Sequence, residues 1–421
     1  MRIKYFCATA ATSGLALLAL VGCANIAQST RAADVLSPPK TALPLSEAVD
    51  RLTITLLTRA EAALVNDSPP SATRALVVDP LVDRATGNQT TTTRSIERRM
   101  TSLVQSRSGP IVNAEFSSAT LDRRPLVLLG TITAVAGPGI IGPTTKPTQT
   151  YRIWAAIADL RTNRIISKDM AWVQADSVDM TPTSFFEDSP AWLADRTLAA
   201  YLKTCSSVAG TVVDPAYING LYASALVADG IRAYEAGEYK RALQAYSDAQ
   251  RQPAGDQVRA YNGIYLADVR LGRTQDAEAA FGNIVSYGLQ QGKLAVKMVF
   301  SPGSTRFWPD RAVSGPYDMW LRQIAAEAST QAGCLHMVGH TSKTGPAAAN
   351  DTLSRARAEY VRAELIERAG ALLSRTDAEG RGSAELLVGS GRDDASDVLD
   401  RRVEFEPRSC FQAGTGPVTR G

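Results

Sequence analysis

The two histidines of the chain, His336 and His340, have a spacing that could support chemistry. They stand four positions apart in "HMVGHT" and are the only histidines among 421 residues. On a helix this spacing places two imidazoles on one face, where they can bind zinc. Here the apolar stretch "CLHMV" followed by Gly339 indicates a strand that ends in a turn. Histidines four apart in a strand lie roughly 13 Å apart, so we expect no metal site and no cofactor.

Two further patterns are typical of cofactor or catalytic sites, and neither has its usual context. "GPGIIG" (137–142) satisfies G-x-G-x-x-G after a strand, but prolines follow where a dinucleotide site needs a helix. The acidic stretches "FFEDSP" and "GRDDASD" are interpreted as a helix cap and a solvated loop rather than as paired catalytic carboxylates. With two histidines and no Ser-x-Gly nucleophile elbow, no catalytic set can be assembled. We therefore expect that the protein is not an enzyme.

The N-terminal residues indicate most clearly where the protein is located in the cell. A basic start (Arg2, Lys4) precedes an apolar run from Gly14 to Val21 and then "VGC", which predicts a signal peptide over 1–22. The run is shorter than the roughly 20 residues that span a bilayer. "LVGC" resembles the bacterial lipobox, which implies lipidation of Cys23. The alternative is a plain secretory signal with an incidental cysteine.

Further features complete this picture of an envelope protein. Lipoproteins kept in the inner membrane have Asp after the cysteine, so Ala24 implies the outer membrane and a protein facing the periplasm. Residues 23–45 are small, polar and proline-bearing, as in a linker. The net charge is +3 without a basic stripe, which excludes a nucleic-acid partner.

Residues 46–206 alternate between helical and strand patterns. A helix is predicted from Ser46, a strand over 75–83, and a second helix over 94–106 with Thr93 as its cap. Three β-rich runs follow, and "EDSPAWLADRTLAAYLKTC" is predicted as a helix with Ser189 as N-cap and Pro190 at its first position. We expect an α/β sandwich. Its order resembles periplasmic lipoprotein domains related to those of curli secretion and flagellar assembly.

Residues 211–293 carry small and aromatic residues at helix–turn–helix spacing. The residues concerned are Gly230, Tyr234, Gly237, Tyr239, Ala242, Tyr246 and Ala249. A second copy follows, with Gly272, Ala277 and Phe281 35 residues after their counterparts. The pattern resembles tetratricopeptide repeats. "SYGLQQGKLA" is predicted to supply a capping helix, because two repeats alone are marginal. The segment is either a helical spacer or a groove for a protein partner.

The stretch that follows the second histidine resembles the OmpA-like peptidoglycan-binding domain. That family combines Gly-His-Thr-Asp, a nearby Gly, and Asn-x-x-Leu-Ser-x-x-Arg-Ala-x-x-Val-x-x-x-Leu. This chain supplies Gly339, His340, Thr341, Gly345, Asn350, Leu353, Ser354, Arg357, Ala358, Val361 and Leu365 at matching spacing. "DRRVEF" (400–405) matches the closing strand. The resemblance covers 294–411 and implies a βαβαββ fold.

The resemblance also implies a ligand, the diaminopimelate-type stem peptide of peptidoglycan. Arg357 would hold a carboxylate with its fork of N–H groups, beside a helix entrance that also attracts anions. Asn350 and Leu353 would line the groove beside Thr341, and Arg402 would support it.

One residue departs from the family pattern. The family most often has Asp where this chain has Ser342, followed by Lys343. Losing a charge-assisted contact costs on the order of 1–3 kcal/mol. We therefore expect weaker binding, or reliance on Asp351 or a backbone carbonyl.

The cysteines fit the same scheme. Cys334 opens the strand before "GHT", and Cys410 follows the "RRVEF" strand. If those strands are neighbours, a Cys334–Cys410 disulfide stabilises the fold by roughly 4 kcal/mol on the chain-entropy model. Cys205 is then left unpaired.

Together these features predict a multidomain α+β lipoprotein. It would combine the N-terminal α/β sandwich, a short all-α repeat segment and the C-terminal OmpA-like domain. The expected function is non-catalytic tethering of the outer membrane to peptidoglycan. The alternative is an accessory lipoprotein for envelope assembly or secretion, acting through protein partners of the N-terminal and repeat segments. A wall-cleaving enzyme is a more distant rival.

Overall fold

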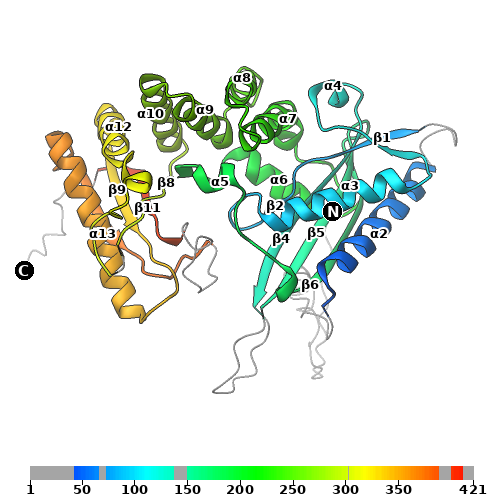
Figure 1. Cartoon of the computed structure of the whole chain (residues 1–421), viewed down its shortest axis with the longest axis horizontal. Coiled ribbons are helices and arrows are strands. Elements are labelled where there is room, and N and C mark those ends of the chain that lie inside the picture. Colours follow the sequence, from blue (N-terminus) through cyan, green and yellow to red (C-terminus); the bar gives the residue numbers. More distant parts are fainter. Residues whose placement is uncertain (1–41, 66–72, 137–148, 302, 388–399, 411–421) are drawn as a thin grey trace, which may run out of the picture.

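The computed structural model describes residues 42–65, 73–136, 149–301, 303–387 and 400–410. The N-terminal sheet, the helical repeats and the C-terminal sheet follow one another along the long axis (Figure 1). The predicted signal peptide, Cys23, most of the linker, "GPGIIG" and "GRDDASD" lie outside the described residues. Within the described residues, no helix combines the length and apolar character needed to cross a membrane.

The N-terminal sheet has the strand order β3-β1-β4-β5-β6, with β2 paired to β4. Its strands are β1 (Arg74–Val78), β2 (Val82–Asp83), β3 (Ile111–Asn113), β4 (Leu126–Ala136), β5 (Gln149–Asp159) and β6 (Arg164–Gln174). Strands β4, β5 and β6 form the antiparallel meander expected from the sequence, while β1 runs parallel to β3 and β4. The predicted strand over 75–83 is two short strands that both run parallel to β4, and the register shifts by one residue between them, where Pro80 lies.

Helices cover both faces of this sheet. On one face α2 (Leu45–Val65) and α3 (Thr91–Ser106) build a core with the inward side chains of β4 and β5. On the other face lie α6 (Arg196–Ser206) and α7 (Pro215–Glu235), together with the short α4 (Ser118–Leu121). Thr93 is not the cap of α3. Thr90 is the N-cap, and Thr93 closes a capping box by accepting from the backbone N–H of Thr90 at 2.8 Å.

The single helix predicted after residue 187 is wrong. The chain instead forms α5 (Ser184–Asp188), strand β7 (Ala191–Trp192) and then α6, whose N-cap is Asp195. Ser189 is the C-cap of α5. Local capping signals are overridden here because β7 pairs antiparallel with β8 (Leu294–Val296), a strand about a hundred residues later in the chain.

The repeat region consists of two helical hairpins. Helix α7 pairs with α8 (Tyr239–Gln250), and α9 (Val258–Arg270) pairs with α10 (Thr274–Gln290). Tyr246 fills the space between them. A Cβ atom added at Gly230 or Gly263 would lie 2.6 or 2.5 Å from its ring, so both positions need glycine. This is the packing role that the repeat resemblance assigns to small and aromatic residues.

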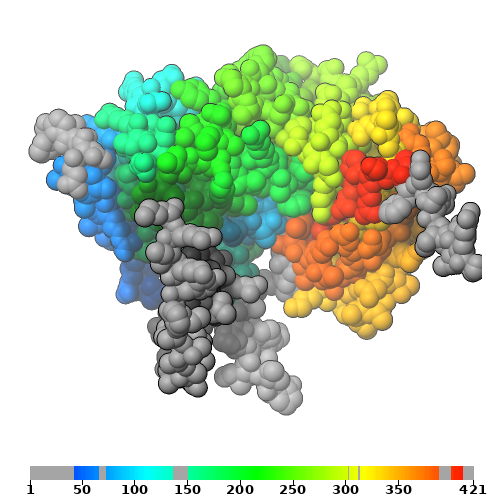
Figure 2. Space-filling model, turned by 180° about the vertical axis from the view of Figure 1, so that it is seen from behind, coloured from blue at the N-terminus to red at the C-terminus, as the bar shows by residue number. Residues whose placement is uncertain are grey.

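The cap of the repeats is not the predicted one. Residues 286–290 continue α10, and "GKLA" leads directly into β8. The next layer is α12 (Tyr317–Thr330) of the C-terminal region, whose Trp320 stacks on Phe281 with 5.2 Å between ring centroids. Figure 2, which shows the molecule from behind, shows the repeats in direct contact with the C-terminal region.

The C-terminal sheet has the order β10-β9-β11-β8-β7. The other elements of this region are β9 (Cys334–Gly339), β10 (Thr376–Gly380), β11 (Val403–Arg408), α11 (Arg311–Ser314) and α13 (Ala347–Arg368). Short 3-10 turns lie at Ala175–Ser177, in the N-terminal region, and at Gly370–Leu372. Apart from the short α11, the order β8-α12-β9-α13-β10-β11 follows the βαβαββ pattern. One hydrophobic core extends from α5 through the repeats to β11, so it crosses the boundaries expected at 206 and 293.

Candidate functional site

The motif residues lie on the loop after β9, on α13 and just before β11. Thr341, Ser342, Asn350, Arg357 and Arg402 are all buried, and Leu353 is half-buried. Thr341 and Ser342 follow β9, and Asn350 and Arg357 lie on α13. The structure joins Asn350 to the loop after β9 and the His340 N–H to the Arg402 carbonyl, whereas Arg357 contacts the segment around Phe300.

The loop after β9 is fixed by the first turn of α13. Asn350 Nδ2 donates to the carbonyl oxygens of Thr344, at 3.0 Å, and Ser342, at 3.4 Å. The Ser342 and Thr344 hydroxyls are 3.0 Å apart. Gly345 has a φ of +92°, which only glycine adopts without strain. Asn350 is thus a support of the loop, as well as one of its predicted lining residues.

Arg357 holds a hairpin that sequence reasoning did not connect with the site. Its Nε donates to the carbonyl of Ser304 at 3.1 Å, and one Nη donates to that of Ser301 at 3.3 Å. The guanidinium carbon lies 4.8 Å from the centroid of the Phe300 ring. Phe300 in turn packs on Phe307, with ring centroids 5.1 Å apart. The signal for this contact was the aromatic pair at the two ends of "FSPGSTRF".

Arg402 belongs to a buried charged cluster. Its Nε donates to Glu404 at 2.7 Å, and Lys293 Nζ lies 2.6 Å from the other carboxylate oxygen. His340 Nε2 is 3.4 Å from Glu404. Burial alone would raise the pKa of Glu404, but its neighbours His340, Arg402 and Lys293 hold it well below its usual range. Arg402 therefore acts as a support at the beginning of β11.

The two histidines serve different clusters. His336 lies between Asp377 and Glu379 of β10, at 2.6 and 3.1 Å. Ligand atoms of His340, Glu385 and Glu404 lie within 4.8 Å of one another. Two cations already occupy Glu404, however, and a metal ion there would have to displace them.

Cys334 and Cys410 form a disulfide in the structure, with Cα atoms 4.8 Å apart. This is the pair favoured from the sequence, and it closes the open end of the β9–β11 ladder. Cys205 is a free, buried thiol whose pKa burial raises to about 11. Such a thiol is unreactive at neutral pH.

The helical repeats already hold a peptide segment, and it comes from this chain. We call residues 184–195 the strap. Asn262 Nδ2 on α9 donates to the Ala191 carbonyl at 2.8 Å, and Phe185 stacks on Tyr246 with centroids 5.8 Å apart. Tyr234 donates to Asp188 at 2.6 Å. The strap thus occupies part of the surface that the sequence had offered to a protein partner.

No protein-family model matches this chain, and no curated protein matches it. Solved structures resemble limited parts of it. The cell wall anchor of the T6SS from Pseudomonas aeruginosa is 23% identical, over 28% of this chain and 80% of its own, with a TM-score of 0.24. The peptidoglycan-associated lipoprotein from Burkholderia pseudomallei is 23% identical over 26% of this chain and 88% of its own, with a TM-score of 0.23. The periplasmic domain of Helicobacter pylori MotB is 16% identical over 29% and 78%, with a TM-score of 0.24.

Proposed function

We propose that the C-terminal region binds the stem peptides of peptidoglycan, and that the protein is a lipoprotein that tethers the outer membrane to the cell wall. The observation that carries the proposal is the position of Arg357. Its buried guanidinium is held by two carbonyls and one ring on the inner side of α13. The loop over 341–345 lies against the first turn of the same helix.

This arrangement suits a carboxylate. Arg357 is the eleventh residue of α13, about 15 Å along the axis from the helix start, so the guanidinium, and not the N–H groups of the first turn, would hold the carboxylate. A guanidinium adds paired N–H donors and stays charged at every physiological pH. The two carbonyls and the Phe300 ring hold it in one orientation, which lowers the ordering cost of binding.

Ser342 sets the expected strength of binding. A hydroxyl accepts a hydrogen bond from the ligand's ammonium group but supplies no charge. We therefore propose that this chain binds stem peptides more weakly than an equivalent site with an aspartate.

Co-sedimentation of the full-length chain with insoluble peptidoglycan tests the proposal. Arg357→Ala should weaken the affinity for peptidoglycan by about tenfold, the loss of roughly 1.4 kcal/mol or more from a charge-assisted contact. Arg355→Ala is the matched control, because Arg355 is an exposed arginine on the same helix. Ser342→Asp should increase binding. If Arg357→Ala and Arg355→Ala bind like the unaltered chain, Arg357 is not part of a wall-binding site.

A further inference from the structure

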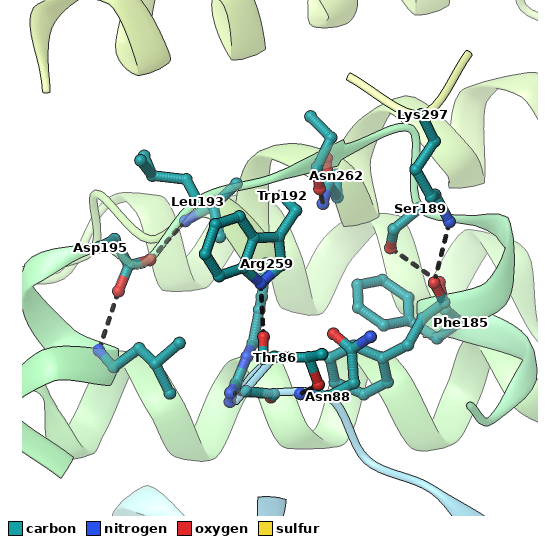
Figure 3. A pocket seen from close by; sticks show the side chains of 15 residues that line it. Thr86, Asn88, Phe185, Ser189, Trp192, Leu193, Asp195, Arg259, Asn262 and Lys297 are labelled. Atoms are coloured by element: carbon teal, nitrogen blue, oxygen red, sulfur yellow. Dashed lines mark hydrogen bonds between the residues drawn. The ribbon is translucent and has the colours of Figure 1, made fainter. Parts of the chain in front are cut away.

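The repeat surface beneath the strap is closed to a protein partner. The cavity there has a volume of about 30 Å³, and its lining includes Asp195, Asn262 and Lys297, which follows β8 (Figure 3). A cavity of this size holds one or two waters. Asn262 is bonded to the Ala191 carbonyl of the strap at 2.8 Å. A partner of the N-terminal half of the molecule therefore needs a surface that is exposed.

One end of the N-terminal sheet carries a strongly basic surface. Two exposed arginines precede β4, one follows β5 and one opens β6, and we call these four residues the basic patch: Arg123, Arg124, Arg161 and Arg164. The Leu160 N–H donates to the Pro125 carbonyl at 3.2 Å, which brings the start of β4 beside the end of β5. Helix α4, which ends just before the first two arginines, lies on the side of the molecule away from the C-terminal sheet (Figure 1).

Two apolar side chains adjoin the basic patch. Val208 and Val212 are 66% and 59% exposed, so most of each isopropyl group faces solvent. Their loop is fixed to the same end of the sheet, because Val212 bridges to Arg164 and the Arg164 guanidinium donates to the Gly210 carbonyl at 2.6 Å. The surface thus combines positive charge with exposed aliphatic groups.

The arginines of the basic patch form no ion pairs with neighbouring carboxylates. Among the described residues, none of the four guanidinium groups has a carboxylate oxygen within 4.0 Å. The acidic residues closest to them in the sequence have other partners, since Tyr222 donates to Asp122 at 2.6 Å and Arg74 donates to the buried Asp159 at 2.5 Å. Four unpaired arginines in one exposed area create a positive field that attracts anionic groups.

The backbone at Arg124 is a separate indication that its charge has a role. Its φ is +50°, a left-handed conformation that is uncommon for residues other than glycine. Strained positions of this kind are concentrated at functional sites. The turn before β4 thus presents a cation at a position where glycine would fit without strain.

We propose that the basic patch binds an acidic segment of a partner protein, in which carboxylates flank an aliphatic side chain. The guanidinium groups hold the carboxylates through paired N–H donors. The aliphatic side chain covers Val208 and Val212, which removes apolar surface from water. Tethering to the wall requires no such partner, so this is an additional binding function of the N-terminal region.

A protein fits the basic patch better than an anionic bilayer does. The patch and its two valines include no tryptophan or tyrosine, the side chains in which membrane interfaces are enriched. A second reason rests on the lipid anchor proposed above. The linker reaches the sheet where Leu43 pairs with Val173, nine positions along β6 from Arg164. This is about 30 Å along the strand, so the patch lies away from the anchored end.

Selection from a random library of short peptides tests the proposal, with the full-length chain as bait. The enriched peptides should carry several Asp or Glu residues around Leu, Ile or Val. Their affinity should fall by about tenfold or more for the double variant Arg123→Glu, Arg161→Glu. The matched control is Arg98→Glu, Arg355→Glu, which makes the same change in net charge at exposed arginines elsewhere and should leave the affinity unchanged.

Arg124→Gly separates the loss of charge from damage to the fold. The substitution removes one cation and relieves the left-handed backbone, so the midpoint of thermal unfolding should stay the same or rise. The affinity for the enriched peptides should nevertheless fall by about threefold. An unchanged affinity in Arg124→Gly would remove this arginine from the binding surface.

Two outcomes of the selection would overturn the proposal. One is a set of enriched peptides without an acidic bias, and the other is equal affinity for the unaltered chain and for Arg123→Glu, Arg161→Glu. Vesicles of phosphatidylglycerol test the membrane as the occupant, and binding to them that this double variant abolishes would also overturn it.

Pelleting with insoluble peptidoglycan separates this proposal from that of wall binding. The unaltered chain and Arg123→Glu, Arg161→Glu should pellet equally, because wall binding is assigned to Arg357. Loss of pelleting in the double variant would assign the basic patch to the wall and not to a protein.

Discussion

The two sheets of the molecule are joined to the helical repeats in different ways. The N-terminal sheet receives a helix on its face, with Tyr217 of α7 donating to Asp79 at the end of β1 at 2.7 Å. The C-terminal sheet receives a strand at its edge, β7, and shares one hydrophobic core with the repeats. The core at the first joint includes only α6 and α7 among the long helices, whereas the core at the second joint runs from α5 through all four repeat helices to β11. The region that carries the recognisable motif is therefore the less independent of the two.

The largest expected effect comes from opening the shared core. Phe405 of β11 is fully buried, and Phe405→Ala should cost about 3–5 kcal/mol of unfolding free energy. Because its core continues into the repeats, hydrogen exchange should accelerate in α8–α10 as well as in the C-terminal sheet. Leu128→Ala is the counterpart in the N-terminal core, where Leu128 is fully buried, and should accelerate exchange chiefly in β1, β4 and β5. Exchange confined to the C-terminal sheet in Phe405→Ala would refute a shared core.

A somewhat smaller effect should follow from removing the disulfide. Cys334 and Cys410 are 76 positions apart, and a cross-link over such a loop contributes roughly 4 kcal/mol at most on the chain-entropy model. Denaturant unfolding of Cys410→Ser should show this loss, while Cys205→Ser should leave the response to reductant unchanged. A midpoint for the unaltered protein that reductant does not shift would show that the bond contributes nothing.

The smallest effect should be a pH dependence of the stability that the contact between Asp79 and Tyr217 gives to the first joint. Burial raises the pKa of Asp79 to about 7, although the hydrogen bond from Tyr217 lowers it. The folded state therefore keeps a proton that the unfolded chain releases near pH 4. Stability from this group is complete below that pH and is lost as the pH rises to about 7.

Comparison with Asp79→Asn isolates this contribution. Between pH 5 and pH 7 the variant should gain about 2 kcal/mol relative to the unaltered chain. Asp122→Asn, which alters an exposed tyrosine–aspartate pair with Tyr222, controls for the hydrogen bond itself. At the second joint the stability of the folded state should change with pH in the opposite direction. Because the pKa of Lys297 is lowered to about 8, its contribution to folding grows as the pH rises above that value. Parallel pH profiles for the unaltered chain and Asp79→Asn would remove the buried carboxylate from the first joint.

Sequence reasoning succeeded where a local pattern determines structure. The β4–β6 meander, the repeat hairpins and the strand–loop–helix around Thr341 and Asn350 all follow from periodicity or a spaced motif. Sequence reasoning failed where the structure of a segment depends on pairing with residues far away in the chain. Nothing local distinguishes Ala191–Trp192 as a strand, because its partner β8 lies beyond the repeats. The neutral partners of Arg357 were missed for the same reason, since a helix face does not reveal which hairpin lies over it.

The packing around Tyr246 has a consequence for the evolution of the chain. Its ring excludes any side chain at Gly230 and Gly263, two positions on different helices. A smaller residue at 246 would open space that both glycines could then fill, and a larger residue at either glycine would be tolerated only after such a change. In descendants of this sequence the three positions should therefore vary as a set, with the aromatic ring lost before either glycine is replaced.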